Sequence, residues 1–190
     1  HGDGVAHYQR RQAGERYYGL GEKAGDLERS GRRFEMRTLD AMGYNAASTD
    51  PLYKHIPFTI TRGEEASFGL FYDNLSSCWL DLGNEIDNYH LAYRRYQAEA
   101  GDLDYYLFLG PKVLDVTKAF VRLTGKTHFG PKWSLGYSGS TMHYTDAPDA
   151  QQQLQQFIQL CRQHDIPCDS FQLSSGYTSI GNKRYVFNWN

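Results

Sequence analysis

Long apolar runs are missing from this 190-residue chain, and no stretch approaches the roughly 18 consecutive apolar residues of a membrane-spanning helix. No basic-then-apolar segment opens the sequence, so we expect neither a membrane contact nor an export signal. An excess of one charge is also missing, because 20 basic residues nearly balance 22 acidic ones. No run of Lys or Arg forms a stripe that would follow a phosphate backbone, so we expect no nucleic acid partner.

Cysteine is scarce as well, with an odd number of residues and no short metal-binding spacing: Cys78, Cys161 and Cys168. This pattern predicts neither a disulfide framework nor a zinc site. The histidines His55, His128 and His143 lack the paired spacing and neighbouring acids of a metal cluster, so we expect no metal. The odd cysteine count, together with the missing export signal, favours a reducing compartment such as the cytoplasm.

Aromatic residues are abundant instead, with 15 Tyr, 10 Phe and 3 Trp in a chain that is 40% hydrophobic. This composition is sufficient for a packed core. Aromatic rings stack on sugars, but they equally fill the interior of a β-sandwich, so composition alone leaves both roles open.

Short apolar or aromatic runs separated by Gly, Asp, Asn and Ser occupy residues 16–110 and predict an antiparallel all-β unit. The clearest runs are residues 17–20, 57–61, 67–72 and 103–109. No convincing helix interrupts them, which favours a sandwich over an α/β sheet. The preceding residues 1–16 are polar and show no pattern of regular structure.

The spacing then becomes helical. Val113, Val116, Phe120 and Leu123 follow a helical period after Pro111, and Gly125 is a residue type favoured just past a helix end. Residues 132–137 predict a short buried strand.

A second helix is expected to open at Asp146 and Pro148 and to end at residues 164–166. One face of it carries Leu154, Phe157, Ile158 and Cys161. Residues 168–173 then predict another strand.

This order of strand, helix and strand, with about 30 residues between equivalent points, is typical of a parallel βαβ unit. One such unit cannot bury both faces of a parallel sheet, so we expect it to open a larger fold, most economically a (β/α)₈ barrel. An isolated piece would expose an apolar edge and associate, which keeps a homo-oligomer open.

Four motifs occur in a characteristic order: Tyr-Gly-Leu-Gly-Glu at 18–22, Leu-Asp-Ala at 39–41 followed by Asp-Pro-Leu-Tyr-Lys-His-Ile-Pro-Phe at 50–58, Gly-Pro-Lys-Trp-Ser-Leu-Gly-Tyr at 130–137, and Ile-Pro-Cys-Asp at 166–169 followed by Phe-Asn-Trp at 187–189. Through these motifs the chain, from about residue 17 onward, resembles glycoside hydrolase family 31, the α-glucosidase-like family. The resemblance implies a mostly β fold. Its parts would be a galactose-mutarotase-like antiparallel β-sandwich over residues 1–110, a connecting helix and linker over 111–128, and the first βαβ unit of an incomplete (β/α)₈ barrel over 129–190.

The resemblance also implies an enzyme, a retaining α-glycosidase that hydrolyses terminal α-linked glucosyl-type residues of an oligosaccharide or α-glycoside. Transglycosylase, α-xylosidase and α-galactosidase activities of the same family stay open. A rival from another class is a carbohydrate-binding β-sandwich module without catalysis of its own.

Retaining glycosidases use two carboxylates about 5–5.5 Å apart, one as nucleophile and one as acid. In the family both are aspartates on later barrel strands. The segment after the second predicted strand offers Ser174, Ser175 and Gly176 and no acid. We therefore expect no catalytic residue in this chain and no activity from it alone. The chemistry requires no cofactor, since protons and a carboxylate nucleophile suffice.

The resemblance gives four candidate substrate-binding residues: Asp40, Met142, Ser174 and Tyr177. Asp40 matches an aspartate that the family extends on a loop into the barrel mouth, where it binds a sugar hydroxyl; the alternative is an Asx-type turn. Ser174 stands where many members carry an aspartate, and Met142 near where relatives place an aromatic residue. Turn chemistry and gap filling are the respective alternatives.

The other aromatic residues near the predicted strands, Tyr144, Tyr177, Phe187 and Trp189, would either wall a sugar pocket or pack in a core. Glu22 is expected to form a structural ion pair with a basic residue such as Lys54.

Overall fold

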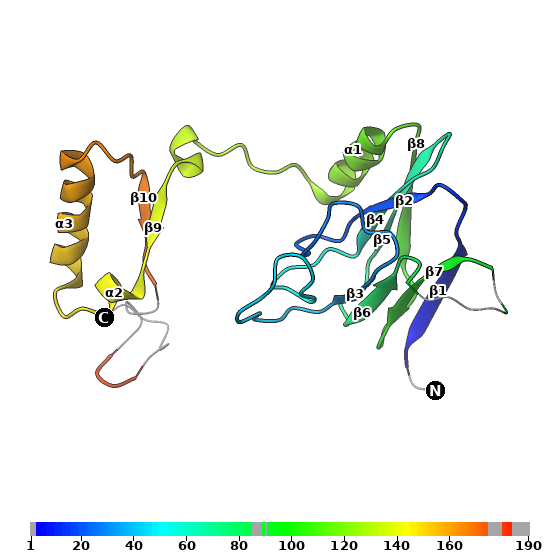
Figure 1. Cartoon of the computed structure of the whole chain (residues 1–190), viewed down its shortest axis with the longest axis horizontal. Coiled ribbons are helices and arrows are strands. Elements are labelled where there is room, and N and C mark those ends of the chain that lie inside the picture. The colour runs from blue at the N-terminus through cyan, green and yellow to red at the C-terminus, as the bar shows by residue number, and fades with distance from the viewer. Residues whose placement is uncertain (1–2, 85–88, 90, 175–179, 184–190) are drawn as a thin grey trace. The chain divides into compact units, whose positions relative to one another are not determined.

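The computed structural model describes residues 3–84, 89, 91–174 and 180–183, and the chain divides into two compact units, His1–Lys126 (unit 1) and Thr127–Asn190 (unit 2) (Figure 1). Unit 1 holds β1 (Val5–Arg10), β2 (Arg16–Gly19), β3 (Arg33–Met36), β4 (Phe58–Arg62), β5 (Ser67–Tyr72), β6 (Cys78–Asp81), β7 (Tyr93–Ala98), β8 (Tyr105–Gly110) and α1 (Val113–Thr124). Unit 2 holds the 3₁₀ helix η1 (Lys132–Leu135), β9 (Ser138–Ser140), α2 (Met142–Thr145), α3 (Ala150–Gln163) and β10 (Ser170–Gln172). Within these described ranges, every helix is too short or too polar to cross a membrane.

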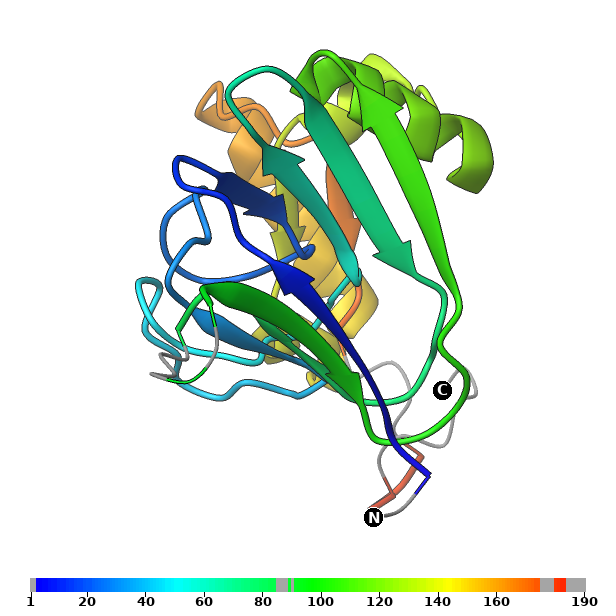
Figure 2. The same cartoon turned by 90° about the vertical axis from the view of Figure 1, so that its right-hand side faces the viewer.

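Unit 1 is a β-sandwich of two antiparallel four-stranded sheets, ordered β1-β7-β6-β3 and β2-β4-β5-β8 (Figure 2). The predicted sandwich is thereby confirmed. Its core lies between the sheets and consists of Tyr17, Leu20, Phe34, Met36, Leu70, Tyr72, Cys78, Leu80, Leu82, Tyr96 and Ala98.

Alternation along the strands places these side chains inside. In β3, Phe34 and Met36 are fully buried, whereas Arg33 and Glu35, which alternate with them, point to the other face. The two sheets meet where the rings of Tyr72 from β5 and Tyr96 from β7 stack, with centroids 3.8 Å apart.

Helix α1 covers the outer face of the second sheet, where it packs on β4, β5 and β8. Val116 is fully buried there, and the Phe120 ring stacks on Phe58 at a centroid distance of 4.0 Å. Gly69 of β5 provides the space, because a Cβ at this position would lie 2.6 Å from Val116 Cγ1. The predicted connecting helix is confirmed, including its end at Gly125.

The expectation that residues 1–16 lack regular structure is wrong. Val5–Arg10 form β1, which pairs along its whole length with β7. Its side chains alternate between half-buried Val5, His7 and Gln9 and exposed neighbours. Each face mixes apolar with polar residues, Val5 with His7 and Gln9 on one and Ala6 and Tyr8 with Arg10 on the other, so hydrophobicity alone does not reveal the strand, and the pairing with a distant strand decides the structure.

Unit 2 contains the predicted βαβ unit. Strands β9 and β10 pair in parallel with Ser138 opposite Ser170, and α3 lies between them in the sequence. The helix begins at Ala150 after Asp149, later than predicted, and the short helix α2 precedes it. The strand predicted at residues 168–173 is present as Ser170–Gln172.

The strand predicted at residues 132–137 is wrong. Lys132–Leu135 instead form the 3₁₀ helix η1, and Ser134 donates both its backbone N–H, at 3.0 Å, and its hydroxyl, at 2.7 Å, to the Pro131 carbonyl. The strand begins later, at Ser138. Gly139 in β9 lies against Phe171, whose Cδ2 would be 2.8 Å from an added Cβ, so this strand requires a small residue at its centre.

His7 should make the stability of unit 1 depend on pH. Its Nδ1 lies 3.0 Å from the Tyr72 hydroxyl and its ring stacks on Tyr105. Burial, and then the positive charge of Arg94, lower the pKa of His7 below 6.5. The unfolded chain therefore takes up the proton first, and the free energy of unfolding should fall as the pH drops below 6.5 and through the folded-state pKa.

Urea unfolding at a series of pH values between 5 and 8 measures this dependence. We expect His7→Gln to flatten it relative to the unmodified chain, while His128→Gln, which changes an exposed residue, should leave it as it is. An unchanged pH profile for His7→Gln would contradict the assignment.

Candidate functional site

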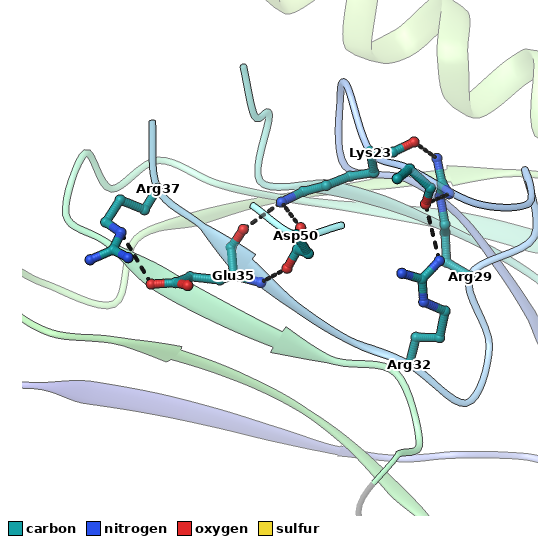
Figure 3. Close-up of polar contacts among 7 residues, drawn as sticks. Lys23, Arg29, Arg32, Glu35, Arg37 and Asp50 are labelled. Atoms are coloured by element: carbon teal, nitrogen blue, oxygen red, sulfur yellow. Dashed lines mark hydrogen bonds and ion pairs between the residues drawn. The ribbon is translucent and has the colours of Figure 1, made fainter. Parts of the chain in front are cut away.

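The loop that joins β3 to β4 carries the candidate residue Asp40 in its first half. Its second half is fixed by a buried ion pair at Asp50. Lys23 Nζ lies 2.6 Å from Asp50 Oδ1, with the two side chains 1% and 15% exposed (Figure 3). Lys23 Nζ also donates to the Glu35 carbonyl, and Asp50 Oδ2 accepts from the Glu35 backbone N–H at 2.5 Å. Each charge therefore has its opposite partner and a hydrogen bond to the same backbone residue, which offsets the cost of desolvating it.

The backbone of Glu35 needs these partners because its strand lies at the edge of a sheet. Strand β3 stands at the edge of its sheet, with β6 on one side only. Lys23 and Asp50 bind the backbone carbonyl and N–H of Glu35, as a neighbouring strand would. The ion pair thus closes the sheet edge and attaches the loop to the core at the same point.

Two arginines stabilise the turn that contains Lys23 by binding the backbone of the next residue. Arg29 Nη1 and Arg32 Nη1 both donate to the Ala24 carbonyl, at 3.1 and 3.0 Å (Figure 3). Their guanidinium carbons and Lys23 Nζ lie 4.6–5.9 Å from the centre of the Phe34 ring. Arg29 is only 5% exposed, and burial, followed by the charge of Arg32, lowers its pKa.

Asp40 itself is exposed in the first half of the same loop. The two halves are joined by Leu39 N–H, which donates to the Leu52 carbonyl at 3.4 Å, and by the Tyr53 hydroxyl, which donates to the Ala41 carbonyl at 3.0 Å. The pKa of Tyr53 is raised by partial desolvation of the phenol and next by the nearby Asp40 carboxylate. Tyr53 therefore binds the backbone of Ala41, the residue that follows Asp40.

In unit 2, two further candidates lie at one edge of the parallel sheet. Met142 follows the end of β9 by two residues, and Ser174 follows the end of β10 by two residues. The strands are parallel and their last residues, Ser140 and Gln172, pair with each other. Met142 and Ser174 therefore both lie just beyond the carboxyl ends of the two strands. This edge is where ligands bind in barrels of alternating strands and helices. Met142 is 49% exposed and Ser174 is half-buried, while Tyr177 lies outside the described residues.

Tyr144 packs among other aromatic residues of unit 2. Its ring centroid lies 5.7 Å from that of Phe157 and 6.3 Å from that of Phe171. Phe187 and Trp189 lie outside the described residues. The predicted ion pair between Glu22 and Lys54 is confirmed, at 3.6 Å between Oε1 and Nζ on the surface. Across the described ranges, no group of three or more His, Cys, Asp or Glu residues could hold a metal ion.

Sequence reasoning missed Lys23, Asp50 and Tyr53 as parts of the site. Asp50 and Tyr53 stand in the Asp-Pro-Leu-Tyr motif, which marked the loop but not their contacts. No periodic pattern connects Lys23 with Asp50, which follows it by 27 residues.

A β-sandwich followed by the opening βαβ unit of a barrel is the architecture found at the start of one class of glycoside hydrolase. Residues 1–81 match the model for the glycosyl hydrolase 31 N-terminal galactose mutarotase-like domain, and residues 127–190 match the model for the glycosyl hydrolases family 31 TIM-barrel domain. The chain therefore belongs to glycoside hydrolase family 31.

Individual relatives agree. The chain is 33% identical to alpha-glucosidase 2 of Bacillus thermoamyloliquefaciens, over 92% of this chain and 21% of the relative, and 29% identical to neutral alpha-glucosidase AB of Sus scrofa, over 92% and 20%. Among solved structures, a GH31 dextranase of Flavobacterium johnsoniae complexed with glucose superposes with a TM-score of 0.80 at 31% identity, over 92% of this chain and 20% of that one. The chain thus spans about a fifth of the length of the curated relatives it matches.

Proposed function

We propose that the complete protein containing this chain is a retaining α-glycosidase that hydrolyses terminal α-linked glucosyl residues of oligosaccharides. The observation that carries the proposal is the succession, on one chain, of the family's sandwich domain and the opening of its barrel domain. In this proposal, the catalytic aspartates follow on later barrel strands. The sugar-binding residues would be Asp40 from the sandwich domain and Met142, Ser174 and Tyr177 from the opening segment of the barrel.

The relatives support glucose as the sugar. The two curated relatives named above are alpha-glucosidases, and the dextranase has been solved in complex with glucose and, as a mutant, in complex with isomaltotriose. An exposed carboxylate such as Asp40 is suited to binding a sugar, because an ionised acceptor binds hydroxyl donors strongly and directionally.

Hydrolysis of p-nitrophenyl α-glucoside, α-xyloside and α-galactoside by the complete protein, and in parallel by this chain, tests the proposal. We expect release of p-nitrophenol from the α-glucoside by the complete protein alone. No cleavage of any of the three would refute the enzymatic proposal, and activity of the short chain would refute the location of the catalytic acids.

Asp40→Asn in the complete protein should weaken substrate binding. The asparagine oxygen still accepts a hydrogen bond, but a neutral bond contributes about 1 kcal/mol against about 1.5–3 for a charged one, so we expect KM for the α-glucoside to rise about two- to thirtyfold while kcat changes less. Glu22→Gln is the matched control, because it also removes one exposed carboxylate, here paired with Lys54, and should leave KM unchanged. An unchanged KM in Asp40→Asn would remove Asp40 from the site.

A further inference from the structure

The two halves of the loop between β3 and β4 differ in how firmly they are bound to the sheet. The side that contains Asp50 is bound to the sheet edge by a hydrogen bond from the Glu35 N–H to Asp50 and by the ion pair between Asp50 and Lys23, which itself donates to the Glu35 carbonyl. The side that contains Asp40 is exposed, from Arg37 to Asp40. The geometry of Asp40 therefore depends on how the exposed side is joined to the bound one.

Tyr53 provides that connection. It follows Asp50 by three residues, and its hydroxyl crosses to the Ala41 carbonyl at 3.0 Å. Ala41 directly follows Asp40, whose carboxylate helps, after desolvation, to raise the pKa of the Tyr53 phenol. The adjacent backbone contact from Leu39 N–H to the Leu52 carbonyl is longer, at 3.4 Å. Asp40 is thus held on both sides by contacts from the residues just after Asp50.

We propose that Tyr53 is a positioning residue for Asp40, and that the Lys23–Asp50 ion pair fixes the side of the loop from which Tyr53 reaches it. The inference rests on the proposed function, since it concerns how Asp40 is presented to a sugar. A carboxylate on an exposed loop has many orientations, and a ligand that must first select one of them binds more weakly. Tyr53 restricts this freedom before the substrate arrives.

Tyr53→Phe in the complete enzyme is the principal test, because it removes one hydroxyl from a half-exposed side chain and should not disturb folding. We expect KM for p-nitrophenyl α-glucoside to rise about three- to tenfold with kcat within about twofold. In an Asp40→Asn background the same substitution should change KM by less than about twofold, because Tyr53 acts through Asp40. Tyr8→Phe, which also removes an exposed tyrosine hydroxyl but in β1, is the matched control and should leave KM unchanged.

Asp50→Asn tests the anchor. The amide oxygen still accepts from the Glu35 N–H, but the charge that faces Lys23 is lost. We expect a rise in KM similar to that of Tyr53→Phe, again absent in the Asp40→Asn background. Thermal melting of each variant shows whether it is folded, and if Asp50→Asn unfolds, Tyr53→Phe decides alone.

The outcomes separate the two proposals. If the unmodified enzyme cleaves no α-glycoside, the proposed function fails. If it is active and Asp40→Asn raises KM while Tyr53→Phe does not, the positioning role is overturned and the function stands. An equal effect of Tyr53→Phe with and without Asp40 would also overturn it, because the tyrosine would then act independently.

Discussion

Replacing Phe34 by alanine should lower the free energy of unfolding by about 3–5 kcal/mol, the usual cost of truncating a buried phenylalanine. Phe34 is fully buried between the two sheets. Its ring also lies beside Lys23, Arg29 and Arg32, so truncation removes three cation–π contacts in addition to core volume.

Urea unfolding of the chain, with the m-value checked for constancy, measures the effect. Phe129→Ala is the matched control, since this phenylalanine is 98% exposed and its removal should change the free energy of unfolding by no more than about 0.5 kcal/mol. A loss below about 1 kcal/mol for Phe34→Ala would show that the ring contributes little to the core.

Gly69→Val should separate α1 from the sandwich and destabilise unit 1 by about 3 kcal/mol, at the upper end of the range for overpacking. A Cβ at this position would lie 2.6 Å from Val116 Cγ1 and 2.7 Å from Phe58 Cε2. Neither atom has room to move, because Val116 is fully buried and the Phe58 ring stacks on Phe120. The helix must therefore shift outward.

Two measurements check this result. The urea midpoint should fall, and trypsin should cut faster after Lys118 and Arg122 of α1. The double variant Gly69→Ala with Val116→Ala should lose less stability than the sum of its single changes, because the second substitution removes the closest clashing atom. Strict additivity would mean that Gly69 does not contact the helix.

The strands that could be predicted are those formed by short apolar or aromatic runs bounded by turn residues, such as β4 and β5. Strand β7 could not, because it contains Arg94, which is 5% exposed in the interior. Arg94 donates to Thr61 Oγ1 at 2.6 Å and lies over the rings of Tyr17 and Phe68. These partners offset the cost of burying the guanidinium group. Because they lie on other strands, the sequence of β7 alone does not indicate that Arg94 is buried.

The candidate site shows the same division. Asp40 could be proposed as a candidate because a motif marks its loop, whereas the Tyr53–Ala41 hydrogen bond and the Lys23–Asp50 pair depend on how the loop folds back on β3. In unit 2 the parallel pairing was predictable from the order of elements. The position of β9 was not, because its Ser-Gly-Ser sequence has weak strand propensity and is selected by the fit of Gly139 to Phe171.

The sheet order has a consequence for folding during synthesis. Val5 of β1 pairs with Ala98 of β7, and β7 also pairs with β6. At roughly 5–20 residues per second, β1 waits on the order of 10 s for its partner to be made. Contacts this distant in sequence slow folding, because the intervening loop must be closed before they form. β1, the earliest of the described strands of this sandwich in chain order, is therefore among the last to be paired.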